Sequence, residues 1–368
     1  MRLEKARWYN DAQCAAVLTI DDLSYGYLDP TGRGVQPFTD WGYACQRENS
    51  IFHYFETQFL QRFPEVRYTV FVPCGAHSVL LADGGYPHHA GDAFENPEYG
   101  ALLQHIAATG NEVAYHGHHH GVRAPSLEPQ SWLDEDREYT LEQYRDLVAA
   151  DVARLEREYG IRLHGGRSPG YHNGPGILAA ATSGLFQWWS FDYTPYACHY
   201  AYRGVVFALP TNVGGQVLRR PAGVWRGLLE MWHAEQRIGR LIAQGALINV
   251  TEHFMQARSD GKRQTPSVFD DLDSLHRIFG FLKGVDTWYA TCTGIARYRT
   301  AYDHTRLNAW GDGTYELLSQ RTGDDQQLSL VGDVARLQAV TSGTILQGRR
   351  KRGRWVFPNV PPGVYRGL

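Results

Sequence analysis

Apolar runs of strand length alternate with amphipathic runs of helix length through the first 290 residues of this chain. Such alternation predicts parallel strands joined by crossover helices, because two parallel neighbours need a long connection. Strands are expected at 15–20, 66–72, 112–116, 161–166, 186–191, 246–251 and 286–290, and helices at 50–62, 99–109, 139–159, 231–244 and 267–283. This many parallel strands in one domain indicate a closed or nearly closed α/β barrel.

The pattern changes near residue 300, where short strand-length segments are separated by Gly, Asp and Asn turns. Such spacing is typical of a small antiparallel β-domain. We therefore expect two domains, a barrel over 1–299 and a β-sandwich-like domain over 300–368. The second domain is expected to bind carbohydrate, to cover the barrel edge or to mediate assembly.

The composition limits the classes to which the protein can belong. The chain is 43% hydrophobic and 20% charged with a net charge of −3, which fits a soluble globular protein and excludes a typical basic nucleic-acid binder. No run is long and apolar enough for a transmembrane helix, and the first residues lack the apolar core of a signal peptide. Because the cysteines are odd in number and scattered, we expect a cytoplasmic protein without a disulfide framework. Its oligomeric state is not predicted.

Metal-binding side chains follow two of the predicted strands. Asp21 and Asp22 end the first strand, and His116 to His120 follow the strand at 112–116. Histidines four apart lie on one side of a helical turn, so His116 and His120 can reach one ion. Each motif alone also fits a turn, a helix cap or a surface tract. Together, at strand ends that share one face of a barrel, they predict a hydrolytic metal site.

These motifs resemble the polysaccharide deacetylase family with the NodB homology domain, also called carbohydrate esterase family 4. The resemblance covers residues 12 to 292 and implies a distorted (β/α)7 barrel. Five motifs occur in the order of the family: Thr19-Ile20-Asp21-Asp22, His116-Gly117-His118-His119-His120, Arg167-Ser168-Pro169-Gly170-Tyr171, Trp188-Trp189-Ser190-Phe191-Asp192 and Thr251-Glu252-His253. Five motifs in order are more specific than any one of them.

The resemblance implies a metal site on Asp22, His116 and His120. The expected ion is Zn²⁺ or another divalent metal such as Co²⁺, Ni²⁺ or Fe²⁺. A carboxylate and two imidazoles with open positions are typical of catalytic metal sites.

The resemblance also implies the catalytic groups. Asp21 would be the base that takes a proton from water, with Arg167 holding it charged and aimed. The backbone N–H of Gly170 would stabilise the oxyanion. His253 would be the acid that protonates the leaving amine, and Asp192 would orient His253 and tune its pKa.

Two departures from the family pattern affect this interpretation. Gly117 stands where the family has Ser or Thr, a hydroxyl that orients the histidine loop, and this leaves His118 and His119 open as alternative ligands. Thr251 stands where the family has a Leu that lines the acyl-methyl pocket. Formyl and other small acyl groups therefore stay open beside acetyl.

The predicted function is metal-dependent removal of an N-acyl group from an amino sugar or sugar conjugate. For a cytoplasmic member, the expected substrate is a nucleotide-linked, lipid-linked or small N-acyl amino sugar, or an oligosaccharide. Two alternatives stay open. One is a carbohydrate-binding protein that keeps a deacetylase-like barrel without catalysis, although the retention of Asp21 speaks against it. The other is a deformylase or a different metal-dependent amidohydrolase.

Overall fold

The computed structural model describes residues 2–26, 33, 36–42, 47–75, 93–118, 140–198, 200–220, 224–254, 264–320 and 328–368. Contacts divide the chain into two compact units. The larger unit comprises Ala16–Gly284 and Tyr289–Thr293. The smaller unit comprises Met1–Ala15, Val285–Trp288 and Gly294–Leu368. Within the described ranges, no helix is long and apolar enough to cross a membrane.

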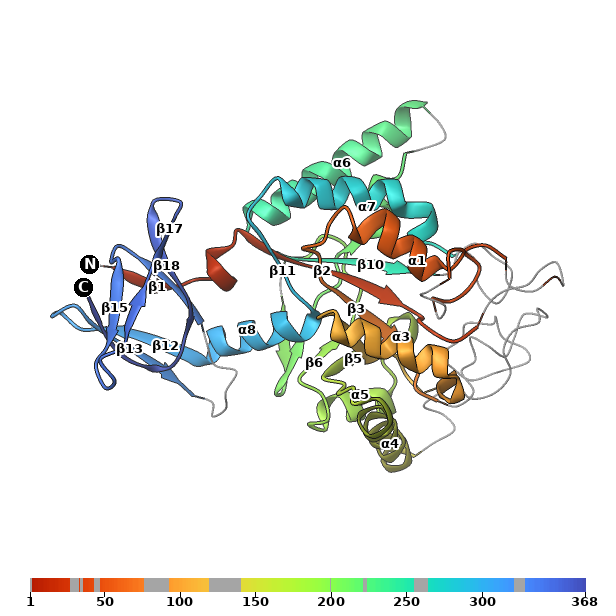
Figure 1. The fold of residues 1–368 in the computed structure, drawn as a ribbon, viewed down its shortest axis with the longest axis horizontal. Helices are drawn as coiled ribbons and strands as arrows, with labels where there is room; N and C mark the ends of the chain where they lie inside the picture. The colour runs from red at the N-terminus through yellow and green to blue at the C-terminus, as the bar shows by residue number, and fades with distance from the viewer. Residues whose placement is uncertain are drawn as a thin grey trace. The chain divides into compact units, whose positions relative to one another are not determined.

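A curled, mainly parallel sheet of ten strands contains most of the strand residues of the larger unit (Figure 1). Its order is β7-β8-β6-β5-β4-β3-β2-β10-β9, and β11 also pairs with β2. The pairs from β2 through β6, β6 with β8, and β10 with β9 are parallel. The strands are β2 (Cys14–Asp21), β3 (Tyr68–Val72), β4 (Glu112–Tyr115), β5 (Gly165–Arg167), β6 (Trp188–Ser190), β7 (Ala201–Arg203), β8 (Val206–Ala208), β9 (Val213–Gly214), β10 (Leu247–His253) and β11 (Thr287–Tyr289). This sheet confirms the predicted fold class.

Helices cover the sheet as the alternating pattern predicts. Figure 1 shows α6, α7 and α1 along β2 and β10, with α4 and α5 beside β5 and β6. The helices are α1 (Ile51–Phe55), which continues into the π-helical η2 (Glu56–Leu60), α3 (Pro97–Ala108), α4 (Leu141–Tyr159), α5 (Pro175–Thr182), α6 (Val224–Ala243), α7 (Val268–Lys283) and α8 (Cys292–His304). The sequence had not predicted α5 or α8, and α6 begins seven residues earlier than the predicted 231.

Local sequence explains where α4 begins and ends. The Thr140 side chain accepts from the Gln143 backbone N–H, and the Gln143 side chain accepts from the Thr140 N–H, which completes a capping box. Gly160 ends the helix at φ 69°, in the left-handed region that favours glycine. Both signals lie close to the predicted bounds of 139 and 159.

The core of the larger unit is apolar on both faces of the central strands. Every residue of β2 and β3 is buried, as expected for parallel strands covered on both sides. Aromatic rings pack the helices against them: Phe55 stacks on Phe59 at 5.5 Å, and Phe254 contacts Phe55 at 5.6 Å. Much of the high aromatic content therefore serves core packing.

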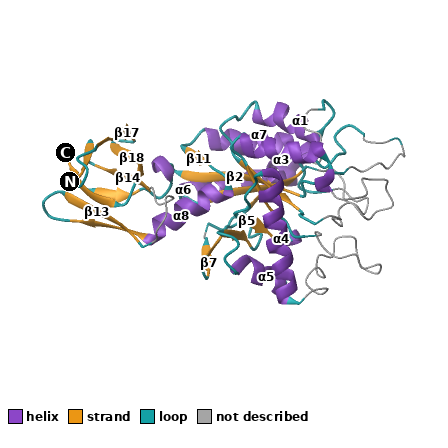
Figure 2. Cartoon of the chain, turned by 60° about the horizontal axis from the view of Figure 1, so that its bottom comes forward, coloured by secondary structure: helices purple, strands orange, loops and turns teal. Residues whose placement is uncertain are grey.

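Two antiparallel sheets form the smaller unit (Figure 2). One has the order β1-β14-β18-β17 and the other β12-β13-β19-β15-β16. The strands are β1 (Leu3–Lys5), β12 (Thr305–Ala309), β13 (Thr314–Ser319), β14 (Leu328–Gly332), β15 (Arg336–Ala339), β16 (Ile345–Gln347), β17 (Arg349–Lys351), β18 (Arg354–Val360) and β19 (Gly363–Gly367). The unit thus joins both ends of the chain, with Leu3 opposite Gly332. Separate folding of residues 300–368 stays a prediction.

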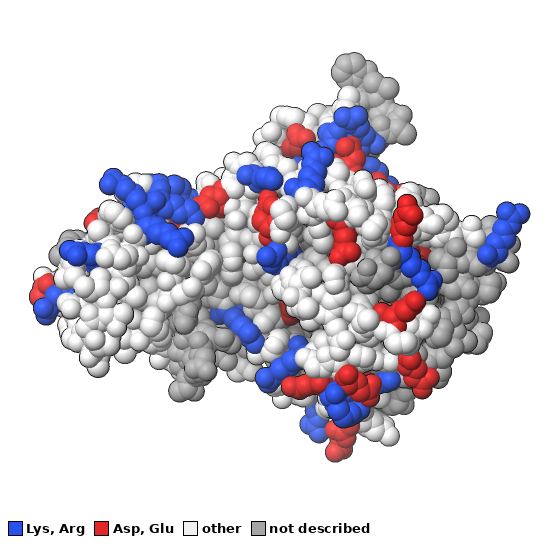
Figure 3. Space-filling view, viewed as in Figure 1, with Lys and Arg blue, Asp and Glu red and all other residues white. Residues whose placement is uncertain are grey.

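Cationic side chains gather over the β17–β18 hairpin (Figure 3). Several of them meet acidic partners within the smaller unit. Lys351 lies 2.7 Å from Asp286, and Arg352 lies 2.9 Å from Asp11. These pairs attach the hairpin to the segment 285–288 and to the N-terminal segment.

Candidate active site

The two adjacent aspartates point to different partners. Asp21 is the last residue of β2, and Asp22 follows it with φ 63°. A left-handed backbone is uncommon outside glycine but is tolerated by aspartate. The turn gives the two buried carboxylates separate surroundings: Asp21 meets Arg167, and Asp22 meets His116.

Arg167, the last residue of β5, is a fully buried charge that holds Asp21. Its Nη1 donates to Asp21 Oδ1 at 2.6 Å. Nη1 also donates to the neutral hydroxyl of Thr251 (3.2 Å), and Nη2 donates to those of Thr19 (3.1 Å) and Thr211 (2.9 Å). Burial lowers the pKa of Arg167, but the charge of Asp21 more than offsets this and the pKa is raised. Arg167 is therefore charged at neutral pH.

Rings enclose this guanidinium. Its carbon lies 4.3 Å from the centre of the Phe71 ring and 5.0 Å from that of Tyr171. Burial also raises the pKa of Tyr171 to about 12, so its phenol is neutral. Flat apolar contacts suit a weakly hydrated guanidinium better than a lysine ammonium.

His116 follows β4 and is buried between Arg167 and Asp22. Its Nδ1 lies 3.0 Å from the Arg167 carbonyl oxygen, and its Nε2 lies 3.1 Å from Asp22 Oδ1. A carbonyl only accepts, so Nδ1 carries the proton and Nε2 faces the carboxylate. Burial lowers the pKa of His116, but the hydrogen bond to Asp22 and the charges of Asp21 and Asp22 outweigh it and raise the pKa. A cation between Nε2 and Asp22 is therefore favoured.

That cation can be a proton or a metal ion. A carboxylate and an imidazole are typical zinc ligands, and a ligating histidine commonly donates its other N–H to a backbone carbonyl, as His116 does. The donor set present thus fits a divalent metal. His119 and His120 lie outside the described residues, and in the part that is described no three His, Cys, Asp or Glu side chains are placed so that they could hold a metal ion. The third ligand stays a prediction.

His253, the last residue of β10, reaches the same carboxylate from another strand. Its Nε2 lies 3.7 Å from Asp22 Oδ2, and its Nδ1 lies 2.9 Å from the carbonyl oxygen of Pro266. The Pro266 carbonyl therefore fixes the ring with Nε2 toward Asp22. The structure brings His253 into the candidate site, as the strand-end argument predicted.

Asp192 has a different partner from the one implied by the resemblance. Its side chain is 63% exposed and lies 3.7 Å from Arg203. The group that contacts His253 Nδ1 is the Pro266 carbonyl, which sequence motifs do not reveal. We therefore transfer the proposed orienting role from Asp192 to Pro266.

Gly170 lies in the short turn after β5, at φ 54°. Asn173 holds this turn: its Nδ2 donates to the carbonyls of Tyr171 (3.0 Å) and Phe191 (2.7 Å), and its Oδ1 accepts from the Ser168 hydroxyl (3.0 Å). Gly170 thus follows the strand that carries Arg167. Its oxyanion role stays a proposal.

The sequence motifs do not reveal the hydroxyls that surround Arg167. A signal was available, because side chains two apart on a strand share one face. Thr19 precedes Asp21 by two positions on β2, and Thr251 precedes His253 by two positions on β10. Polar residues at these spacings lie on the same face as the predicted base and acid.

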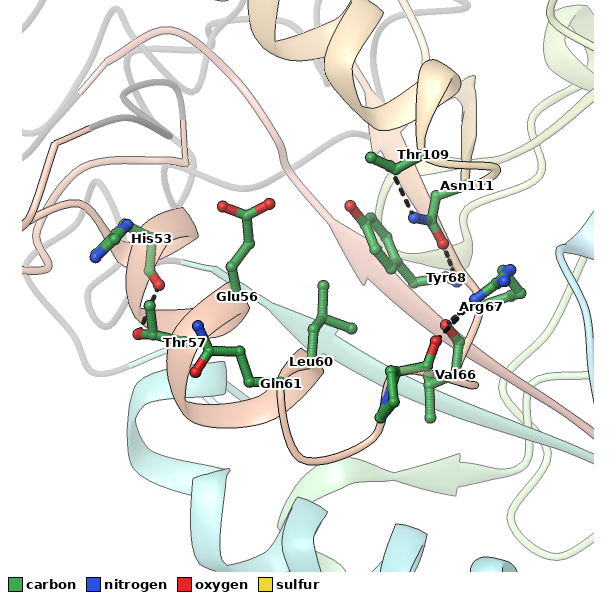
Figure 4. A pocket seen from close by; sticks show the side chains of 11 residues that line it. His53, Glu56, Thr57, Leu60, Gln61, Val66, Arg67, Tyr68, Thr109 and Asn111 are labelled. Atoms are coloured by element: carbon green, nitrogen blue, oxygen red, sulfur yellow. Dashed lines mark hydrogen bonds between the residues drawn. The ribbon is translucent and has the colours of Figure 1, made fainter.

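A cavity of about 540 Å³ lies elsewhere in the larger unit (Figure 4). Its lining includes His53, Glu56, Thr57, Arg67, Thr109 and Asn111 and none of the predicted site residues. It lies near Tyr68, where β3 begins, whereas the candidate site lies where the strands end. Its polar groups serve the fold: Glu56 pairs with His105 at 2.8 Å, and Asn111 accepts from the Tyr68 N–H at 3.1 Å.

Comparison with known proteins supports the fold. No family model and no curated protein matches the chain. A crystal structure from Mycobacterium smegmatis, of a protein provisionally assigned as a polysaccharide deacetylase, is 17% identical with a TM-score of 0.51, and the match covers 81% of this chain and 94% of that one. This likeness confirms, at the level of fold, the resemblance to polysaccharide deacetylases.

Two further structures match with lower TM-scores. A CE4 family pseudoenzyme from Bacillus anthracis is 14% identical with a TM-score of 0.38, over 78% of this chain and 66% of that one. A family 4 acetyl xylan esterase from Clostridium thermocellum, in complex with a cobalt ion, is 14% identical with a TM-score of 0.35, over 76% and 88%.

Proposed function

We propose that this chain is a metal-dependent hydrolase that removes an N-acetyl or another short N-acyl group from an amino sugar or sugar conjugate. One observation carries the proposal. Asp22 faces His116 at 3.1 Å and His253 at 3.7 Å, while the adjacent Asp21 is held at 2.6 Å by the buried Arg167. A pair of carboxylates with these separate surroundings suits one metal ligand and one base.

Asp22 and His116 would hold the metal, with His120 as the predicted third ligand. A bound divalent metal polarises an amide carbonyl and acidifies a water molecule. Asp21 would accept the water proton. Its ion pair with Arg167 holds the carboxylate in one orientation, because the guanidinium is itself fixed by three hydroxyls.

His253 would deliver a proton to the leaving amine. The Pro266 carbonyl fixes its Nδ1–H, so Nε2 is the atom that can exchange a proton on the side of Asp22. Asp21 and His253 come from β2 and β10, so the base and the acid act from separate strands. The Gly170 N–H would support the oxyanion on a turn held by Asn173.

The experiment below identifies which acyl group is removed. The Thr251 hydroxyl, at the position where the family has Leu, accepts from Arg167. The side chain therefore supports the ion pair, and both acetyl and formyl belong in the test. The proposed substrates are nucleotide-linked, lipid-linked or small N-acyl amino sugars and oligosaccharides of a cytoplasmic pathway.

The test is release of the acid from a panel of substrates. Purified protein would be incubated with N-acetylated and N-formylated glucosamine, its nucleotide conjugates and chito-oligosaccharides, and acetate or formate would be measured with the free amine. We expect turnover that a chelator abolishes and Zn²⁺ or Co²⁺ restores. Asp146→Asn, a change of a surface carboxylate that is 72% exposed, should leave it unchanged. Sugar binding without acid release would instead identify a non-catalytic carbohydrate-binding protein.

A further inference from the structure

His118 is held by a buried carboxylate on α4. Its Nδ1 lies 2.8 Å and 3.0 Å from the two oxygens of Asp151. Asp151 is 5% exposed, and its Oδ2 also accepts from the Tyr115 hydroxyl at 3.1 Å. Since a carboxylate only accepts, Nδ1 of His118 carries the proton. The ring is thus tied to a helix outside the candidate site.

Backbone contacts hold the same loop against the segment after β3. The Cys74 N–H donates to the Gly117 carbonyl at 3.0 Å, and the Gly75 N–H donates to the His118 carbonyl at 2.6 Å. Gly117 has φ 79°, a left-handed backbone that favours glycine. A Cβ at Gly75 would lie 2.5 Å from the His118 carbonyl oxygen and 2.9 Å from its ring, so only glycine fits there.

We propose that Asp151 and Tyr115, acting through His118, position the backbone that carries the metal ligands and so set the affinity for the metal. His118 is the second residue after His116, so fixing it limits where the His116 imidazole lies. His118 is then a positioning residue of the site rather than a ligand. This inference rests on the proposed function, because it takes His116 to bind a metal.

The contact between His118 and Asp151 also explains how the histidine loop is held although residue 117 is a glycine. A hydroxyl at that position orients the histidine loop in the resembling family, and Gly117 has none. Here the next residue supplies the fixed point through a charge-assisted hydrogen bond to a buried carboxylate. This pair attaches the loop to α4.

The experiment measures the dissociation constant for Zn²⁺ by competition with a chromophoric chelator, at one pH and well below the melting temperature of every variant. Loss of a partner that orients a metal ligand typically weakens metal binding 10- to 100-fold, and we expect a weakening of about this size for Asp151→Ala. Asp151→Asn should weaken binding less, because its amide oxygen still accepts from Nδ1. Glu158→Ala, an exposed change on the same helix, should have no effect.

Two further variants separate anchoring from direct ligation. Gly75→Ala keeps His118 and Asp151 but forces the His118 carbonyl to move, so it should also weaken zinc binding. His118→Ala should weaken binding about as much as Asp151→Ala, and combining the two should add little. Loss of binding in His118→Ala far beyond that of Asp151→Ala would show that His118 is a ligand and would overturn the proposal.

Two other results of the zinc titrations test the positioning role and the proposed function separately. If the unaltered protein binds zinc and both Asp151→Ala and Gly75→Ala bind it equally tightly, the positioning role is wrong, even where their melting temperatures fall. If the unaltered protein binds no divalent metal, the proposed function itself fails. The two failures are therefore distinguishable in one set of titrations.

Discussion

Replacing Arg167 by methionine should cost about 3–5 kcal/mol of unfolding free energy, because breaking a buried ion pair leaves one charge without a partner. The Arg167 side chain is 0% exposed and that of Asp21 is 8% exposed, so water cannot replace the lost contact. Methionine fills similar space, so most of the cost arises from the unpaired carboxylate. Adding Asp21→Asn to Arg167→Met removes that charge, and the double variant should be more stable than the sum of the single effects predicts.

The assay is urea unfolding followed by tryptophan fluorescence, since Trp188 and Trp189 are fully buried on β6, the strand that pairs with the β5 strand of Arg167. The non-additivity of the cycle should be about 1–3 kcal/mol. Arg203→Met is the control, because its pair with Asp192 is exposed and such pairs contribute about 0–1 kcal/mol. Single effects that add within about 0.5 kcal/mol would refute the idea that Asp21 and Arg167 are coupled in the folded protein.

Two further predictions use the direction of pKa shifts. Burial and the nearby Asp271 raise the pKa of Glu252 well above its usual value. The folded state therefore binds a proton that the unfolded state releases as pH rises past about 4.5. Glu252→Gln should therefore stabilise the protein by an amount that grows from pH 4 to pH 8 in urea unfolding, and a gain independent of pH would contradict this. The pKa of His116 is also raised, so in metal-free protein its contribution to stability is complete below about pH 6.5 and is lost as pH rises through the folded value. The stability difference between the unaltered metal-free protein and His116→Asn should accordingly fall between pH 6 and pH 9, and a constant difference would show that His116 is not held by Asp22.

The sequence could predict those site residues that lie at the ends of strands. The apolar run before Asp21 and the run before His116 are parallel strands of one sheet, so their polar ends meet at one edge. Period-two spacing would also have indicated Thr19 and Thr251. These signals are local, because the side-chain direction along a strand follows from the backbone geometry.

Contacts between distant segments were beyond the sequence. The Pro266 carbonyl reaches His253 from a turn before α7, and Asp151 reaches His118 from the middle of α4. A backbone carbonyl has no side-chain signature, and one buried carboxylate on an amphipathic helix resembles its solvent-facing neighbours in sequence. The pairing of Leu3 with Gly332 likewise joins segments whose separation no local pattern encodes.

The central claim is that the adjacent Asp21 and Asp22 have different tasks. It is tested most directly by measuring zinc affinity and turnover together in Asp21→Asn and Asp22→Asn. We predict that Asp21→Asn binds zinc with nearly unaltered affinity and loses about 10²- to 10⁴-fold in turnover, as expected for loss of a general base. Asp22→Asn should lose zinc binding. Turnover close to that of the unaltered protein in Asp21→Asn, or undiminished zinc binding in Asp22→Asn, would contradict the assignment.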